Sequence, residues 1–467
     1  MPDWLSILPP LLAIVVAIWK KEVVLALALG IWMSESLIVG RTMTGVESAF
    51  VAIPESMGQG FIEMIDRLVS VFEDGGNTRV LLFCLLVGML IELMQVSGGV
   101  TAFVKRMTQM GMADTQRRAG LLTMAIGVLV WMETSMSCLA AGMVGRPLFD
   151  RFKLSRARLA YVLDSTCAPV SVIILLNAWG GYILELLEKG EYGFEEPVNV
   201  VMSSIGFNFY AILTLGLVAY TAISGRTHGA LRRVEAEESE AETPDEPSKA
   251  LPDHVKGKAG HMLIPLVIMV ALMVLFLMRT GSGSRSVLYS VTVATVIGVL
   301  LLIRDRVFTY REIIEHGYRG MGKLLPVVLL MLLAFAIGAS CRELGTGSFV
   351  AGWVGSFLPL WLVAPLLFIC AGIISFTTGT SWGTFAILIP VGMPLGAAFG
   401  LPPGFVLAAV LGGGVFGDHC SPISDTTLVA SLASGCDHLE HVRTQLPYAM
   451  TAGLGTILLY MAMGLFL

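Results

Sequence analysis

A single polar stretch determines how this chain must fold: Gly417-Asp418-His419-Cys420-Ser421-Pro422-Ile423-Ser424-Asp425-Thr426-Thr427. It interrupts an apolar segment that runs from about 406 to 432. A charge at the centre of a bilayer costs roughly 2.5–3.5 kcal/mol on insertion scales, and proline removes a backbone donor and clashes with the preceding turn. Such backbone is tolerated at membrane depth only inside protein or beside a water-filled cavity. The stretch therefore predicts a broken helix with an ion site at the break.

The composition is that of a polytopic membrane protein. Of 467 residues, 55% are hydrophobic and only 14% are charged, whereas soluble proteins carry about 25% charged residues. The net charge is −5 without a basic tail, so lipids and small solutes are the expected partners and nucleic acid is not. The seven cysteines show no paired C-x-x-C spacing, which argues against a disulfide framework or a zinc site. No cofactor is expected.

Apolar runs of about 17–25 residues mark membrane spans in the first half of the chain. The run 121–149 is interrupted by the polar group Glu133-Thr134-Ser135-Met136-Ser137 and has basic residues on both sides. Because positive residues prefer the cytoplasm, a re-entrant hairpin over about 119–148 explains this pattern better than a single crossing. We expect a broken helix over about 159–185, interrupted at Asp164–Ser171, and an interfacial segment at 41–78. The other expected spans are 5–19, 22–40, 79–96 and 200–223.

A charged segment, 224–258, separates the two halves and predicts a disordered cytoplasmic linker. In the second half, a hairpin is expected over about 360–398 with Thr377–Ser381 at its tip, and a broken helix over about 403–434. An arm is expected at 342–358. The remaining spans are expected at 261–279, 287–303, 323–341 and 447–466.

The two halves resemble each other in the order and spacing of three motifs. Val144–Leu148 corresponds to Val391–Leu395, Glu133-Thr134-Ser135 to Gly379-Thr380-Ser381, and the stretch around Asp164 and Pro169 to that around Asp418 and Pro422. We interpret 1–223 and 259–467 as an inverted repeat with about ten spans and two hairpins. Both termini would then lie outside and the linker inside. Paired interrupted segments are typical of transporters that bind substrate near the midplane.

The interrupted segments concentrate oxygen ligands, which a hard cation such as Na⁺ requires. Carboxylates come from Asp418, Asp164, Asp425 and Glu133, and His419 is the one histidine expected well inside a span. A buried carboxylate holds either a proton or Na⁺, and that competition is the minimal chemistry of an antiporter. We expect Asp418, Asp164, Thr380 and Ser421 to contact Na⁺. Further hydroxyl groups are supplied by Thr134, Ser135, Thr166, Ser381 and Ser424.

Several of these side chains also have a purely structural interpretation. Single Ser and Thr residues often pack membrane helices together. Asp425 is well placed to cap the second half-helix. His419 could simply form a hydrogen bond to a carbonyl across the break. Glu133 could instead stabilise the structure of the hairpin tip. Glu92 is expected at the membrane interface.

The stretch 417–427 resembles the NhaC family of Na⁺/H⁺ antiporters, as do Phe376–Thr384 and Asp164–Ser171. The resemblance covers most of the chain outside the linker. It implies the fold of the ion transporter superfamily, with a scaffold domain and a transport domain that carries two opposed hairpins. It also implies a bacterial inner-membrane protein, usually a homodimer, with elevator-type movement of the transport domain.

Other activities are considered beside Na⁺/H⁺ exchange. The family includes exchangers of organic acids such as malate and lactate, but the predicted site holds several carboxylates and neither lysine nor arginine, which favours cations. Drug efflux and a passive channel are weaker alternatives. Gly379-Thr380-Ser381-Trp382-Gly383 matches G-x-S-x-G, so a membrane hydrolase that uses Ser381 is a rival, although that motif requires a strand-turn-helix context.

Overall fold

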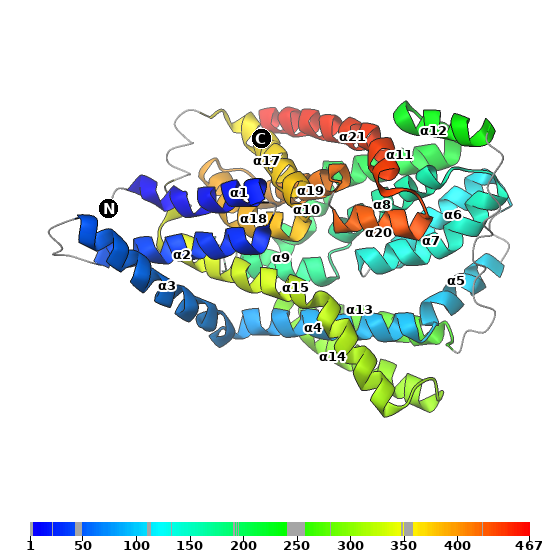
Figure 1. Cartoon of the computed structure of the whole chain (residues 1–467), viewed down its shortest axis with the longest axis horizontal. Helices are drawn as coiled ribbons and strands as arrows, with labels where there is room; N and C mark the ends of the chain where they lie inside the picture. Colours follow the sequence, from blue (N-terminus) through cyan, green and yellow to red (C-terminus); the bar gives the residue numbers. More distant parts are fainter. Residues whose placement is uncertain are drawn as a thin grey trace.

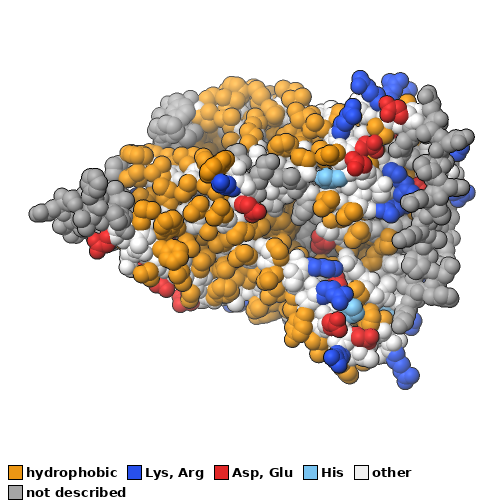
Figure 2. Space-filling view, viewed as in Figure 1, with side chains coloured by type: hydrophobic (Ala, Val, Ile, Leu, Met, Phe, Trp, Pro, Cys, Tyr) orange, Lys and Arg blue, Asp and Glu red, His pale blue; other side chains and the backbone are white. Residues whose placement is uncertain are grey.

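A computed structural model describes residues 3–467 except 21, 43–48, 110–113, 132, 190–191, 193, 195, 241–256, 281, 347–348, 350–357 and 423. In this part of the chain all regular structure is helical, and eleven segments are long and apolar enough to cross a membrane. The predicted all-α polytopic fold is thereby confirmed. Figure 1 shows both termini on the side of the molecule away from α12. Lys and Arg side chains gather toward the α12 end, whereas an apolar surface covers the middle (Figure 2).

The first helices follow the predicted spans closely. Residues 41–78, expected at the interface, contain one long helix, α3, that packs beside α2. The elements are a 3-10 turn η1 (Asp3–Ile7), then α1 (Leu8–Lys20), α2 (Val23–Thr42), α3 (Ala49–Glu73), α4 (Gly75–Val96) and α5 (Gly99–Gln109).

The first hairpin consists of α6 (Gln116–Leu129) and α7 (Thr134–Arg151), which pack together. The turn is fixed by Glu133, whose carboxylate accepts hydrogen bonds from the backbone N–H groups of Ser135 at 2.9 Å and Met136 at 2.6 Å. A carboxylate at this position satisfies N–H groups that have no partner inside the helix. Glu133 therefore has the structural role that was one of its two expected roles.

The next helix breaks at a different place from the one predicted. α8 (Arg156–Ile173) runs without interruption through Asp164 and Pro169, and the break separates it from α9 (Ala178–Lys189). Within a helix a proline removes one hydrogen bond and clashes with the preceding turn, and this helix continues for one more turn. It ends where the Asn177 amide donates to the Ser171 carbonyl at 2.8 Å. The prediction of a break at Asp164–Ser171 was therefore wrong by several residues.

The predicted single span 200–223 is also divided in two. α10 (Pro197–Phe207) and α11 (Phe209–Ser224) meet at Asn208, whose side-chain oxygen accepts from the Ala211 N–H at 3.3 Å. Asparagine is a favourable N-cap because its side chain replaces a missing backbone acceptor. The polar residue thus starts a new helix inside an apolar run.

The linker begins as a docked helix. α12 (Gly229–Glu240) buries Leu231, and its Glu235 carboxylate pairs with Arg158 of α8 at 3.3 Å. Thr227 donates to the same carboxylate at 2.6 Å. The prediction of disorder is therefore wrong for this part of the linker, while 241–256 lie outside the described residues.

The second half has the expected order of elements. Most of the predicted arm 342–358 lies outside the described residues, and the last helix begins at His438, well before the expected 447. The elements are α13 (Gly260–Thr280), α14 (Gly283–Arg304), α15 (Tyr310–Glu343), a 3-10 turn η2 (Leu360–Leu362), α17 (Val363–Thr378), α18 (Ser381–Ala398), α19 (Pro403–Cys420), α20 (Asp425–Ser434) and α21 (His438–Phe466).

Two turns in the second half lie where the sequence predicts them. Gly379 ends α17 with a φ of 69°, a left-handed conformation that suits glycine. The break between α19 and α20 begins at Ser421. Ser424 is the N-cap of α20, because its hydroxyl accepts from the Thr427 N–H at 3.4 Å. Asp425, which had been considered as the cap, is the first residue of that helix.

Helices α4 and α15 pack tightly against each other, because two glycines allow their backbones to approach closely. Together they form a wall beside the hairpins. A Cβ atom on Gly320 would lie 2.4 Å from the Gly88 carbonyl oxygen, and one on Gly88 would lie 2.6 Å from the Gly320 oxygen. Real Cβ contacts are not this short, so neither position has room for a side chain. The two helices therefore pack at the closest approach that their backbones allow.

Candidate functional site

Asp418 joins the second hairpin to the second helix break. Its side chain is 1% exposed. One carboxylate oxygen accepts a hydrogen bond from the hydroxyl of Ser381, at the start of α18, and the other accepts from Ser424 at 2.7 Å. Two hydroxyl donors suit an ionised carboxylate, which has acceptor sites only. The carboxylate thus connects three helix ends, those of α18, α19 and α20.

A cavity of about 160 Å³ opens beside Asp418. The second half contributes Asp418 and Thr426, whose hydroxyl lies 3.0 Å from that of Ser424. In the first half, the hydroxyls of Thr134 and Ser171 lie 3.2 Å apart. At the hairpin tip and the helix break of the first half, the lining residues are Glu133, Thr134, Ser135, Ser171, Asn177, Ala178 and Trp179. Polar groups that are far apart in the sequence therefore surround one space.

The opposite side of the cavity is the wall made by α4 and α15. It is mainly apolar, with Val87 and Leu324 among its residues. It also contains Lys323, whose ammonium nitrogen lies 2.5 Å from the Glu92 carboxylate. The Glu92 side chain is buried in the protein and does not itself line the cavity. The expectation of a site without lysine was therefore wrong, although this lysine has a partner.

Asp164 lies outside the cavity lining and is fully buried. Its Oδ2 accepts from the Gln445 amide at 2.6 Å and the Thr427 hydroxyl at 3.2 Å, and lies 3.4 Å from His441 Nε2. Its Oδ1 has no hydrogen-bond partner within the described residues. Thr427 also donates to the Asp418 carbonyl at 3.3 Å. One hydroxyl therefore connects the surroundings of the two aspartates.

Three of these partners escaped the sequence analysis: Thr427, His441 and Gln445. The last two lie ahead of the predicted start of the final span and outside every expected span. His441 is fully buried, and His419 is therefore not the only embedded histidine. The available signal was the spacing of four residues between His441 and Gln445, which places them on one face of a helix.

His419 and Ser421 point to other neighbours. His419 Nδ1 lies 2.9 Å from the Tyr210 hydroxyl, and its Nε2 has no partner within the described residues. Ser421 donates to the Phe376 carbonyl at 2.8 Å and so ties the break to α17. Neither residue lines the cavity.

The remaining predicted residues lie away from the cavity or outside the description. Thr380 is the N-cap residue of α18 without a side-chain cap bond. The Thr166 hydroxyl is buried without a hydrogen-bond partner within the described residues, and the Thr166 methyl group packs close to Gly127 of α6. The side chain of Asp425 lies outside the described residues. Of the four expected Na⁺ ligands, only Asp418 lines the cavity.

The surroundings of Ser381 do not match those of a hydrolase nucleophile. Its hydroxyl donates to Asp418, whereas a nucleophilic serine is paired with a general base such as histidine. It also begins a helix that follows another helix, so the strand-turn-helix context of the G-x-S-x-G motif is missing at this position. This geometry gives the hydrolase hypothesis no support.

Several relatives of this chain are named antiporters, and one that matches along nearly the whole chain is described as uncharacterized. A protein of Haemophilus influenzae described as uncharacterized is 31% identical over 98% of this chain and 90% of its own length. The malate-2H⁺/Na⁺-lactate antiporter of Bacillus subtilis is 32% identical over about a third of each chain (34% of both). The Na⁺/H⁺ antiporter NhaC of Alkalihalophilus pseudofirmus is 30% identical over 30% of each chain.

The fold and the family agree with these relatives. The solved structure of the Alcanivorax borkumensis YdaH transporter, described as having an unusual topology, matches with a TM-score of 0.58 at 15% identity over 97% of this chain and 98% of that one. The sequence model of the Na⁺/H⁺ antiporter family matches residues 170–465. The predicted resemblance is thus confirmed, and the protein is a transporter rather than an enzyme. The chain belongs to the Na⁺/H⁺ antiporter family.

Proposed function

We propose that this secondary transporter exchanges Na⁺ for H⁺ and that Na⁺ binds at Asp418. The observation that carries the proposal is the buried Asp418 carboxylate beside a polar cavity, with Ser381 and Ser424 in contact. A charge embedded in a membrane protein is costly and is retained mainly for function. When Na⁺ enters, rotation of the two hydroxyls turns their lone pairs toward the ion. The cavity hydroxyls of Thr134, Ser171 and Thr426 then supply further oxygen atoms.

Asp164 is proposed as the second carboxylate of the exchange cycle. It is sealed behind the cavity and lies against His441 and Gln445. The Thr427 hydroxyl donates to both Asp164 and the backbone carbonyl of Asp418. A change in the charge of one aspartate therefore alters a hydrogen bond that also holds the other. In this cycle Asp418 releases Na⁺ and takes up a proton, whereas Asp164 stays ionised behind the cavity.

An elevator-type movement fits the division of the cavity into two sides. The hairpins and broken helices supply the polar side, and α4 and α15 supply the apolar wall. We assign α11 and α21 to the moving part, because Gln445 of α21 holds Asp164 and α11 packs against α8. The Lys- and Arg-rich end is proposed to face the cytoplasm (Figure 2). The inverted repeat and the homodimer remain predictions.

The decisive experiment uses proteoliposomes with a trapped pH dye, to which Na⁺, K⁺ and then malate or lactate are added. A pH response to Na⁺ alone that disappears in Asp418→Asn supports the proposal. The asparagine keeps the size of the side chain and one acceptor oxygen, so a folded but inactive variant is expected. Full exchange in Asp418→Asn would contradict the assignment.

Exchange of an organic acid is the second candidate. A cavity of about 160 Å³ is larger than a bare cation needs, since one water molecule requires only about 10–15 Å³ by the same measure. Its lining includes Lys323 and the Asn177 side chain, which suit a carboxylate ligand. The similarity to the malate-2H⁺/Na⁺-lactate antiporter points the same way. A pH response that requires malate or lactate on one side, and that is lost in Lys323→Met, would favour this candidate.

A further inference from the structure

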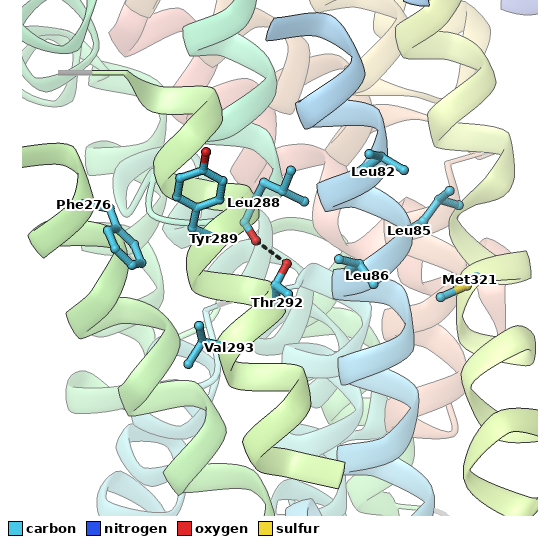
Figure 3. A pocket seen from close by; sticks show the side chains of 9 residues that line it. All are labelled: Leu82, Leu85, Leu86, Phe276, Leu288, Tyr289, Thr292, Val293 and Met321. Atoms are coloured by element: carbon cyan, nitrogen blue, oxygen red, sulfur yellow. Dashed lines mark hydrogen bonds between the residues drawn. The ribbon is translucent and has the colours of Figure 1, made fainter. Parts of the chain in front are cut away.

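An apolar groove lies apart from the ion site, on the surface formed by α4, α13, α14 and α15. Its volume is about 690 Å³, and its walls include Leu82 and Leu86 of α4, Phe276 of α13 and Met321 of α15 (Figure 3). The hydroxyl of Thr292 donates to the Leu288 carbonyl of its own helix at 2.7 Å. The hydroxyl is thereby satisfied, and the groove presents almost only hydrocarbon.

Each of three groove helices carries an arginine one turn beyond its lining residues, toward the same end of the groove. Arg79 precedes Leu82 on α4, and Arg279 follows Phe276 on α13. Arg285 precedes Tyr289 on α14 by four residues, so these two share a helix face. The start of α4 is held beside that of α14, because Arg79 Nε donates to the Ser284 hydroxyl at 3.1 Å. The apolar groove thus has a basic rim at one end.

The charge on this rim is only partly balanced. Arg79 lies in electrostatic range of Glu185 and Glu188, and Glu188 also accepts from the Gly283 N–H at 3.2 Å. Arg279 and Arg285 are exposed and form no ion pair within the described residues. Two guanidinium groups beside an apolar groove match a phosphodiester above a hydrocarbon chain, because arginine binds phosphate oxygens in pairs.

We propose that the groove binds one acyl chain of a phospholipid whose phosphate lies between Arg279 and Arg285. The inference is independent of the transported ion. The site is adjacent to the transport machinery, because the other face of α4 lines the cavity of Asp418 through Cys84, Val87 and Ile91. An anionic headgroup is preferred over a zwitterionic one, because each basic residue at a membrane surface adds attraction to net negative charge.

The test measures lipid retained by the purified full-length protein, using native mass spectrometry with phosphatidylglycerol or phosphatidylcholine. The double variant Arg279→Gln/Arg285→Gln should retain about tenfold less phosphatidylglycerol, given the attraction expected from two basic residues. Its retention of phosphatidylcholine should change much less. The matched control is Arg311→Gln/Arg319→Gln, two exposed arginines on α15, which should behave as wild type.

A second variant tests the chain-binding part of the site. Thr292→Trp places a large side chain in the groove and should lower retention of both lipids. Equal phosphatidylglycerol retention in the rim variant and its control would overturn the proposal. So would a change in the number of protomers per particle in Thr292→Trp without a change in bound lipid, because that result assigns the face to a second copy of the chain.

Discussion

Asp418 and Asp164 occupy matching places in the two halves of the sequence but have different surroundings. Asp418 lies two residues before the end of α19 and lines the cavity. Asp164 lies nine residues before the end of α8, behind the cavity, where Gln445, Thr427 and His441 contact it. An aspartate near a helix end is open to an ion, whereas one inside a helix is available to neighbouring helices only.

The prolines account for part of this difference. Pro422 lies four residues after Asp418 and within the break, whereas Pro169 lies five residues after Asp164 and within the helix. Asn177, which donates to the Ser171 carbonyl, then accompanies a first break that lies about two turns later, relative to the aspartate, than the break in the second half. Similar motifs therefore give one carboxylate that faces the cavity and one that holds helices together.

The largest effect that tests this comparison is expected from Asp164→Asn. Loss of the buried charge should lower Na⁺-driven proton flux by about 100-fold, the size typical of a lost charge-assisted interaction. Na⁺ binding at Asp418 should survive within about threefold, as measured by Na⁺-dependent thermal stabilisation. If Asp164→Asn loses Na⁺ binding as completely as Asp418→Asn, then the two carboxylates form a single ion site and the comparison fails.

The role of Asp164 as a structural anchor is tested at Gln445. Gln445→Leu removes the amide that donates to Asp164 at 2.6 Å and to the His419 carbonyl at 3.1 Å. Leaving these acceptors unpaired should cost about 2–3 kcal/mol of stability, seen as a lower midpoint of thermal unfolding in detergent. Ser165→Ala is the control, because it removes only a 3.3 Å contact to the same glutamine. Equal midpoints for both variants would show that Gln445 does not anchor Asp164.

The proposed role of Asp418 as an ion ligand is tested by Ser381→Ala. This change removes one hydroxyl from the carboxylate and leaves the helix caps intact. Na⁺ affinity should fall about tenfold, equivalent to about 1.4 kcal/mol and within the range for a hydrogen bond to a charged group. Thr384→Ser keeps the hydroxyl that donates to the Thr380 carbonyl and serves as the control. An unchanged apparent Na⁺ affinity in Ser381→Ala would remove Ser381 from the ion site.

A third carboxylate, Asp305, lies outside the membrane-spanning helices and provides a comparison for the two buried aspartates. Hydrogen bonds from Lys258, His261 and Arg304 hold the pKa of Asp305 well below its usual value. The ionised form therefore stabilises the fold at pH values above the unfolded-state pKa of about 3.9, and this stabilisation is lost as the pH falls below it. Between about pH 5 and pH 3, a window that brackets the unfolded-state pKa, the midpoint temperature of unfolding should fall less in Asp305→Asn than in wild type. Parallel curves would contradict this role.

The smallest effect is expected from Pro169→Ala. Because α8 already passes through this position, alanine adds a backbone donor to an existing helix, and stability should not fall, since alanine is more favourable than proline inside a helix. Exchange should remain within about twofold of wild type. Pro422→Ala, within the second break, should reduce exchange more strongly. If Pro169→Ala were the more damaging change, the two prolines would have the same role despite their positions.

The sequence predicts the features that are marked by unusual residues. The hairpin tips at Glu133 and Gly379 and the break at Ser421–Ser424 follow from polar, glycine or proline residues inside apolar runs. Asp418 was identified for the same reason. These features share a local cause, because each residue either ends a helix or cannot remain unpaired in a membrane.

The missed features depend on contacts between distant segments. Asn177 bonds to backbone at the end of α8 and Asn208 caps the start of α11, and neither differs in sequence from an asparagine within a span. Gln445 and Lys323 lie near the ends of apolar runs, and only tertiary packing shows that they reach Asp164 and the cavity. The docking of α12 depends on Arg158, which lies 77 residues before its partner Glu235 in the sequence.

The contact between Gly88 and Gly320 has a mechanical consequence. Where two backbones touch there are no side chains to change rotamer, so α4 and α15 behave at this level as one stiff plate. If the cavity of Asp418 changes width, we therefore expect the opposite side, with its hairpins and broken helices, to be the part that moves. The two glycines thus hold the two helices at a fixed distance, and a methyl group at either position would push α4 and α15 apart.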